Sequence, residues 1–263
     1  MAGAAPVEGV PSGPAEAGNR LCVSGHRVNL RSAPSTRAKV ADRLDLGTTV
    51  MVRAVVPGGS VRIGARHDWW YQVAVLDDTG VAVGKGYLFG GTLTPACILA
   101  DLDGDGETER ATVSVNPQGT PLVRILEPKG TAEVTASLPV TKAGNTPLLR
   151  AEVDLIPHSE AGFAMVRVRV SGDSTEAKAE GRIFYVSYQS AGPGRTGAAT
   201  LALTHPSDGV RGDTAWTTRV QFNGGTGEAQ VTTVTTRSGG APEEAIRYFK
   251  AANGSYVDVT DRR

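Results

Sequence analysis

The sequence predicts an all-β protein, in which a small barrel is followed by a larger antiparallel β domain. Of its 263 residues, 33 are glycine and 15 are proline, which favours many short strands joined by turns. Apolar and polar residues alternate with period two, most clearly at residues 165–170, as in half-buried strands. Helical periodicity is nearly absent. One short helix is expected near residues 242–248, where Glu243 and Glu244 follow Pro242.

Five strands are expected in the first part of the chain. The turn Asp77–Gly80 separates the last two of them. The predicted strands are 28–30, 40–44, 48–56, 69–76 and 81–88.

After Pro95 the strand signals continue at a spacing typical of antiparallel sheets. Asn253-Gly254 is a strong signal for a type I′ hairpin between the last two strands. The predicted strands are 97–100, 112–115, 122–126, 132–138, 148–156, 163–171, 182–189, 198–204, 216–222, 230–236, 248–252 and 255–259.

These patterns divide the chain into three parts. Residues 1–19 are small and rich in Pro and Gly, and they predict a disordered tether. Residues 20–95 are expected to form the barrel, and residues 96–263 a β-rich domain with an acidic loop at 101–109.

Charge and hydropathy exclude several classes of protein. The formal net charge is zero, which argues against a general nucleic-acid binder and against a polybasic membrane-surface protein. No apolar run approaches the roughly 18 residues that span a bilayer. The first residues lack a signal-peptide pattern. We expect a mature secreted or periplasmic chain whose signal was removed; the alternative is a cytoplasmic protein with a flexible start.

Four motifs follow one another in the barrel region. They are VNLRSAPS at residues 28–35, L-x-x-G-T-x-V at 44–50, W-W-x-x-V at 69–73 and G-x-G-Y-L at 84–88. Their order and spacing resemble the bacterial SH3 (SH3b) family. The resemblance implies an SH3-like barrel, which in this family binds cell-wall peptide or glycan or spaces another domain.

Aromatic side chains are the candidate ligand-binding residues of this barrel. Successive strand residues face opposite sides, so Trp69 and Tyr71 are expected on one face and Trp70 on the other. Together with Tyr87 they either line a groove or fill the core. The insertion 57–68, which contains Arg62, Arg66 and His67, is longer than in compact members of the family.

Two cysteines, Cys22 and Cys97, bracket the barrel. The ends of an SH3-like barrel lie close together, so the resemblance implies a Cys22–Cys97 disulfide and an oxidising compartment. The alternative is a pair of unrelated buried cysteines. No cysteine–histidine pattern of a zinc or redox site is present.

The acidic loop DLDGDGETE at residues 101–109 predicts a Ca²⁺ site. Alternate carboxylates on a sharply turning loop converge, and hard oxygen ligands select Ca²⁺. The expected ligands are Asp101, Asp103, Asp105, the main chain of Glu107, and Glu109. The alternative is a solvated acidic turn.

The same loop resembles the calcium loops of FG-GAP and VCBS-type repeats. Thr112 stands at the twelfth position and a strand follows, so the loop is not an EF-hand. Those repeats normally occur several times, whereas this chain has one copy.

We therefore expect a secreted or periplasmic bacterial binding protein without enzymatic activity. Its partner is expected to be a cell-wall peptide or glycan, or an envelope protein, with Ca²⁺ stabilising the β domain. One alternative is a purely structural accessory module of an envelope complex. Another is a cell-wall hydrolase accessory or enzyme, for which no catalytic motif is found in the sequence.

Overall fold

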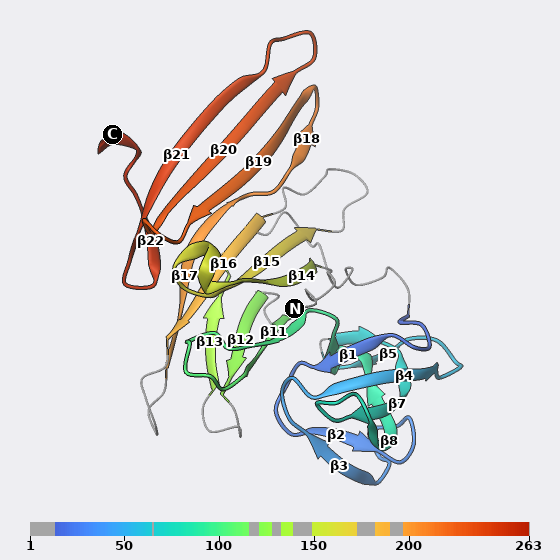
Figure 1. The fold of residues 1–263 in the computed structure, drawn as a ribbon. Coiled ribbons are helices and arrows are strands. Elements are labelled where there is room, and N and C mark those ends of the chain that lie inside the picture. Colours follow the sequence, from blue (N-terminus) through green and yellow to red (C-terminus); the bar gives the residue numbers. More distant parts are fainter. Residues whose placement is uncertain are drawn as a thin grey trace.

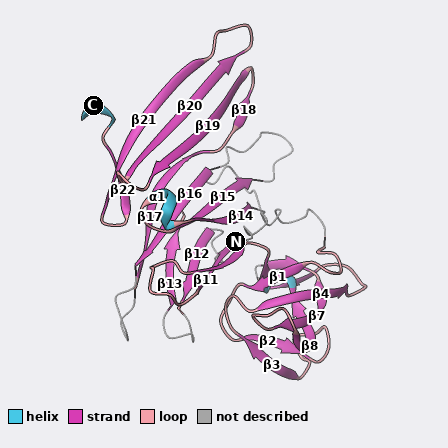
Figure 2. Ribbon diagram, in the orientation of Figure 1, coloured by secondary structure: helices cyan, strands magenta, loops and turns pink. Residues whose placement is uncertain are grey.

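The computed structural model describes residues 14–64, 66–115, 121–127, 133–138, 149–172, 182–189 and 197–262, with the side chains of residues 66, 67, 115, 149, 150, 171, 172, 210, 211 and 262 left aside. Figure 1 shows a barrel beside three further sheets that follow one another along the chain. Figure 2 shows that nearly all of the regular structure is strand. The predicted all-β class is confirmed. No helix within the described ranges is long and apolar enough to cross a membrane.

A seven-stranded sheet in the order β3-β2-β8-β7-β4-β1-β9 forms the SH3-like barrel. A separate hairpin, β5 and β6, lies in the insertion. The strands are β1 Arg20–Val23, β2 Val28–Arg31, β3 Val40–Leu44, β4 Thr49–Val55, β5 Val61–Ile63, β6 Arg66–Asp68, β7 Trp70–Leu76, β8 Ala82–Phe89 and β9 Leu93–Thr94.

The barrel encloses its own apolar core. Period-two alternation points Leu21 and Val23 of β1, and Val50 and Val52 of β4, inward against Val73 of β7. Their burial is nearly complete. The turn Asp77–Gly80 is confirmed, because the Asp77 carboxylate accepts hydrogen bonds from the main-chain N–H groups of Thr79 and Val81.

The start of the barrel differs from the expected tether. The structure places residues 14–19 on the barrel: Ala15 is buried in its core, and its N–H donates to the Tyr71 hydroxyl. The main-chain N–H of Gly18 donates to the Val52 carbonyl. These contacts explain why a segment of small residues is held in place. Residues 1–13 lie outside the described residues.

Two four-stranded antiparallel sheets and one five-stranded sheet follow the barrel. The short helix α1, His158–Ala161, connects the first two strands of the second four-stranded sheet. The strands are β10 Cys97–Ala100, β11 Glu109–Val115, β12 Pro121–Leu126, β13 Glu133–Ser137, β14 Leu149–Ile156, β15 Met165–Gly172, β16 Arg182–Gln189, β17 Ala198–Pro206, β18 Gly209–Arg211, β19 Thr214–Asn223, β20 Glu228–Arg237, β21 Glu243–Ala252 and β22 Ser255–Asp258.

The β14–β17 sheet lies between the other two. On one face, Val168 and Phe184 pack against Val123 and Ile125 of the β10–β13 sheet. On the other, Met165 and Tyr185 belong to a cluster with side chains of β20, β21 and β22. Burial on both faces explains why six consecutive residues of β16 are buried.

The expected helix at residues 242–248 is wrong, because the structure forms β21 there. β21 pairs with β20 from Glu243 to Lys250 and with β22 through Ala252. This pairing outweighs the weak local helix signal. The predicted Asn253-Gly254 turn is confirmed, and both residues have the positive φ that a type I′ turn needs.

Candidate functional site

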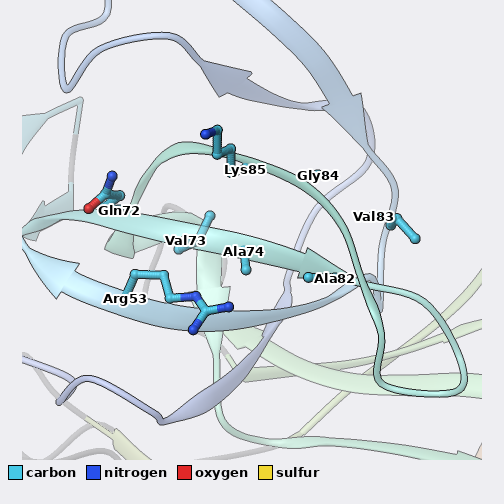
Figure 3. Close-up of a pocket in the computed structure, with 8 residues that line it drawn as sticks. All are labelled: Arg53, Gln72, Val73, Ala74, Ala82, Val83, Gly84 and Lys85. Carbon is cyan, nitrogen blue, oxygen red and sulfur yellow. The ribbon is translucent and has the colours of Figure 1, made fainter.

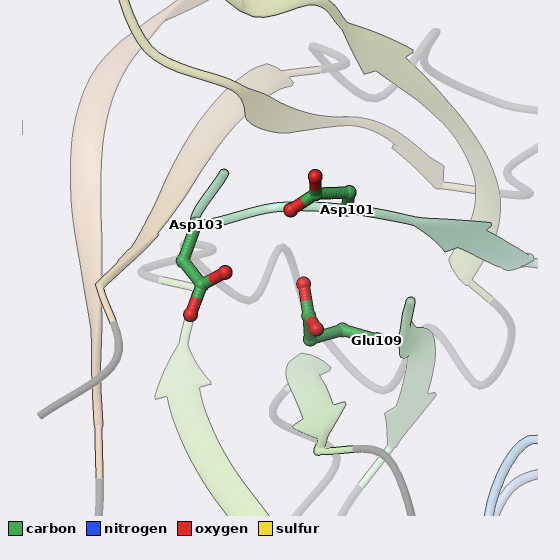
Figure 4. Close-up of side chains that lie close together, drawn as sticks. All are labelled: Asp101, Asp103 and Glu109. Carbon is green, nitrogen blue, oxygen red and sulfur yellow. The ribbon is translucent and has the colours of Figure 1, made fainter. Parts of the chain in front are cut away.

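The acidic loop joins β10 to β11 and brings three carboxylates together. Ligand atoms of Asp101, Asp103 and Glu109 all lie within 4.8 Å of one another. Figure 4 shows the three side chains facing a common space. The Asp105 carboxylate, which the sequence also assigned to this site, is not part of this side-chain group. The expected contribution of Glu107 is its main-chain carbonyl, and it stays a prediction.

Hydrogen bonds within the loop set its shape. The two carboxylate oxygens of Asp101 accept from the N–H groups of Gly104 and Gly106. Gly106, at the sixth position of the loop, has φ +88°, a left-handed backbone that glycine adopts without steric cost. Asp105 uses one oxygen to accept from the Glu107 N–H.

Glu109 is the most unusual residue of the loop. Its side chain is fully buried. Oε2 accepts a 2.6 Å hydrogen bond from the Leu102 N–H, whereas Oε1 is buried with no partner among the described residues. One carboxylate oxygen of Asp103, Oδ2, is likewise buried without such a partner. Unsatisfied buried oxygens are costly, so each of the two calls for a partner, which can be a proton, a water molecule or a cation.

The pKa of Glu109 is raised by its surroundings in the acidic loop. Burial raises the pKa of Glu109 to about 7, and the nearby Asp103, Glu127 and Asp105 carboxylates act in the same direction. The Leu102 N–H opposes the shift only in part. Without a cation, Glu109 therefore holds its proton far more tightly than an ordinary glutamate.

Two residues that sequence reasoning missed approach this loop. Glu127 follows β12, and its carboxylate accepts a hydrogen bond from the hydroxyl of Tyr188 on β16. Burial raises the pKa of Tyr188, and Glu127, Asp103 and Glu109 raise it further. Glu127 is 18 positions beyond Glu109, and only the pairing of strands reveals that they are close.

The barrel aromatics divide as strand alternation predicts. Trp69 packs against the barrel core with Tyr71, whereas Trp70 lies outside that core and contacts Phe89 with the two rings tilted and their centroids 6.0 Å apart. Trp70 and Tyr71 keep only 7% and 4% of their surface exposed. These two residues belong to the interior, one of the two alternatives that the sequence left open. Trp69 and Tyr87 are partly exposed.

A shallow hollow of about 450 Å³ lies elsewhere on the barrel, where β4, β7 and β8 run side by side. Figure 3 shows Arg53 and Lys85 on opposite sides of β7. None of the four predicted aromatics lines this hollow. In the insertion, β5 and β6 pair through Val61 and Asp68.

The barrel is fastened to the β10–β13 sheet at several points. Cys22 of β1 and Cys97 of β10 form the expected disulfide. Gly47 has φ +76°, and a Cβ there would lie 2.8 Å from the Cβ of Arg110 on β11. Arg110 also forms an ion pair with Asp78 of the barrel. A residue larger than glycine at position 47 would therefore require Arg110 or the Gly47 backbone to shift.

Comparison with known families agrees with the barrel. Residues 26–94 match the bacterial SH3 domain family. No curated protein and no solved structure matches the chain. The resemblance of residues 101–109 to FG-GAP and VCBS calcium loops stays a prediction.

Proposed function

We propose that this chain is an extracytoplasmic bacterial binding protein, whose barrel recognises a cell-wall peptide or glycan or an envelope protein. The observation that carries the proposal is the match of residues 26–94 to the bacterial SH3 domain, a bacterial binding module that often serves the cell wall. The role assigned to the chain is binding rather than catalysis.

The Cys22–Cys97 pair supports a location outside the cytoplasm. Disulfides persist in secreted and periplasmic proteins and are rare where thiol reductants are abundant. This bond closes the barrel and joins it to the next sheet, so its role here is structural.

We further propose that the acidic loop binds Ca²⁺ through Asp101, Asp103 and Glu109. Carboxylate oxygens are the ligands that Ca²⁺ prefers. Glu109 Oε1 and Asp103 Oδ2 are buried and lack partners among the described residues, which fits a cation better than a solvated turn. A bound cation would neutralise the charge that burial disfavours.

Sedimentation with purified peptidoglycan tests the binding role. The whole chain is mixed with insoluble peptidoglycan, with Ca²⁺ or with chelator, at low and high ionic strength. We expect the chain in the pellet, and as much of it for Val257→Ala, which truncates an exposed apolar residue of β22 outside the barrel. A chain that stays in the supernatant under every condition argues against wall binding.

The same mixture tests the enzymatic alternative. A hydrolase would clear the turbid suspension and release soluble fragments. We expect constant turbidity during incubation with the chain, while a known wall hydrolase clears a parallel sample. If this chain clears the suspension, it is a wall hydrolase and the proposed binding role is wrong.

Thermal unfolding tests the calcium proposal. A ligand that binds only the folded state stabilises it, by about 2.7 kcal/mol at a hundredfold excess over Kd. We expect a higher melting temperature with Ca²⁺ than with chelator, and a smaller effect from Mg²⁺, which demands a more regular shell of ligands. Identical melting curves would contradict the proposal.

A further inference from the structure

The hollow between β4, β7 and β8 has a lining that points to a class of ligand. Two basic side chains, Arg53 and Lys85, lie on either side of the small apolar residue Ala74 (Figure 3). The other exposed side chains of the lining are Gln72, Ala82 and Val83. No acidic residue lines the hollow.

Two irregularities of the sheet meet at this place. Along β4 and β7, Val52 pairs with Val73 and Ala54 pairs with Gln72, so Arg53 is an extra residue in its strand. This is a β-bulge.

A second bulge lies on the other side of β7. Val75 pairs with Gly84 and Leu76 with Ala82, which leaves Val83 as the extra residue of β8. Bulges redirect side chains and are frequent beside functional sites. Here both extra residues, Arg53 and Val83, line the same hollow.

The exposure of these side chains leaves both positive charge and apolar surface available to a ligand. Val83 is 65% exposed, although it is a large apolar residue. Arg53 and Lys85 are exposed, and neither has an ion-pair partner among the described residues. Uncompensated positive charge next to exposed apolar surface is complementary to a ligand with carboxylates and small apolar groups.

We propose that this hollow is the ligand site of the barrel, and that its ligand is an acidic peptide segment. The inference rests on the proposed binding function and names the class of partner. Arg53 and Lys85 bind carboxylates of the peptide, Gln72 hydrogen-bonds its main chain, and Val83 and Ala82 contact its small side chains. A polyphosphate would use the two charges but not the apolar lining.

Fluorescence anisotropy with labelled peptides tests the proposal on the whole chain. Three probes of equal length are used, with alternating Glu-Ala, Gln-Ala or Lys-Ala residues. We expect binding of the Glu-Ala probe alone. The double variant Arg53→Gln/Lys85→Gln should weaken it at least about tenfold, since it removes the charge-assisted hydrogen bonds to the carboxylates of the peptide.

A matched control removes the same charge elsewhere. Arg219→Gln/Lys250→Gln changes two exposed basic residues of β19 and β21, and it should alter the affinity by less than about twofold. Equal weakening by both double variants would show general charge attraction and overturn the site. Tighter binding of inorganic polyphosphate than of the Glu-Ala probe would overturn the peptide assignment.

The peptidoglycan experiment separates this inference from the proposed function. If Arg53→Gln/Lys85→Gln sediments with peptidoglycan as the unmodified chain does, the hollow is not the site, although the binding function stands. If the unmodified chain does not sediment but binds the Glu-Ala probe through Arg53 and Lys85, wall binding is wrong and the hollow is confirmed.

Discussion

Arg124 on β12 donates a 2.7 Å hydrogen bond from Nη1 to the main-chain carbonyl of Ser24, which joins the β10–β13 sheet to the barrel. Its other guanidinium nitrogens hold the carboxylate of Glu133, which also contacts His26 of the barrel. The side chains of Arg124 and Glu133 are each only 20% exposed. This contact complements the disulfide between the same two parts.

Arg124→Met tests that contact. The variant removes the hydrogen bond to Ser24 and deprives Glu133 of a partly buried partner, so we expect the free energy of unfolding to fall by about 1–3 kcal/mol. Urea unfolding measures the change. Arg169→Met breaks the exposed pair with Glu152 and should cost less than about 1 kcal/mol. Equal losses would mean that the junction contributes no more than a surface pair.

Cys22→Ser/Cys97→Ser tests the contribution of the disulfide. The bond spans 75 residues, and in the chain-entropy account its loss costs about 4–5 kcal/mol. Urea unfolding is compared with and without a reducing agent. The reductant should destabilise the unmodified chain and leave the double variant unchanged. No effect of reductant on the unmodified chain would contradict the role given to this bond.

Tyr71→Phe tests the burial of the aromatic that the sequence placed among groove candidates. The hydroxyl accepts a 3.0 Å hydrogen bond from Ala15 N–H, so its loss should cost about 1 kcal/mol. Hydrogen exchange should accelerate at Ala15 and Gly18, whose amides hold residues 14–19 on the barrel. Tyr87→Phe, at a partly exposed position, should leave these amides unchanged. Unaltered exchange in Tyr71→Phe would show that another contact holds the segment.

Glu109→Gln tests the metal assignment in two conditions. With chelator, the variant should melt at the same temperature as the unmodified chain or higher, because a neutral amide replaces a buried carboxylate. With Ca²⁺, the unmodified chain should gain stability and the variant should not. Glu244→Gln removes an exposed carboxylate of β21 and should keep the full calcium effect. A full calcium effect in Glu109→Gln would remove this residue from the site.

His205→Gln tests a pH dependence. Burial lowers the pKa of His205 below its usual 6.5, although the Pro206 carbonyl opposes the shift. Below about pH 6.5 His205 is protonated in the unfolded chain but stays neutral in the folded chain. The free energy of unfolding therefore decreases as the pH is lowered, until the pH reaches the lowered pKa of the folded state. Unfolding is measured between neutral and mildly acidic pH.

The variant should lose less stability than the unmodified chain over this range, by up to about 1.4 kcal/mol per pH unit. Comparing the two curves removes the contributions of all other groups. His158→Gln, at an exposed position of α1, should follow the unmodified curve. Parallel curves for His205→Gln and the unmodified chain would contradict the prediction.

Features encoded within a few residues could be predicted from the sequence. Strand alternation at residues 166–170 and the Asn253-Gly254 turn depend on local side-chain spacing and backbone freedom, and the structure confirms both. The acidic loop belongs to the same class, since Asp101 and Glu109 are separated by one turn and the start of a strand. The helix at 242–248 failed because pairing with β20 lies outside any local window.

Features that depend on partner strands could not be predicted. Arg53 and Val83 are bulge residues only in relation to the register of β7. Glu127 reaches the acidic loop because β11 and β12 pair, and Tyr188 because a second sheet packs there. Likewise, the Tyr71 hydroxyl bonds to Ala15 of residues 14–19, a segment whose composition alone indicates disorder.

The Cys22–Cys97 bond also determines how tension passes through the molecule. When the chain is pulled from both ends, force leaves Cys22 through the sulfur atoms and enters β10 at Cys97. Residues 23–96 form a loop that this covalent path bypasses. A pull on both ends would therefore act on residues 14–22, which include the start of β1, and on the later sheets, while most of the barrel lies in the bypassed loop.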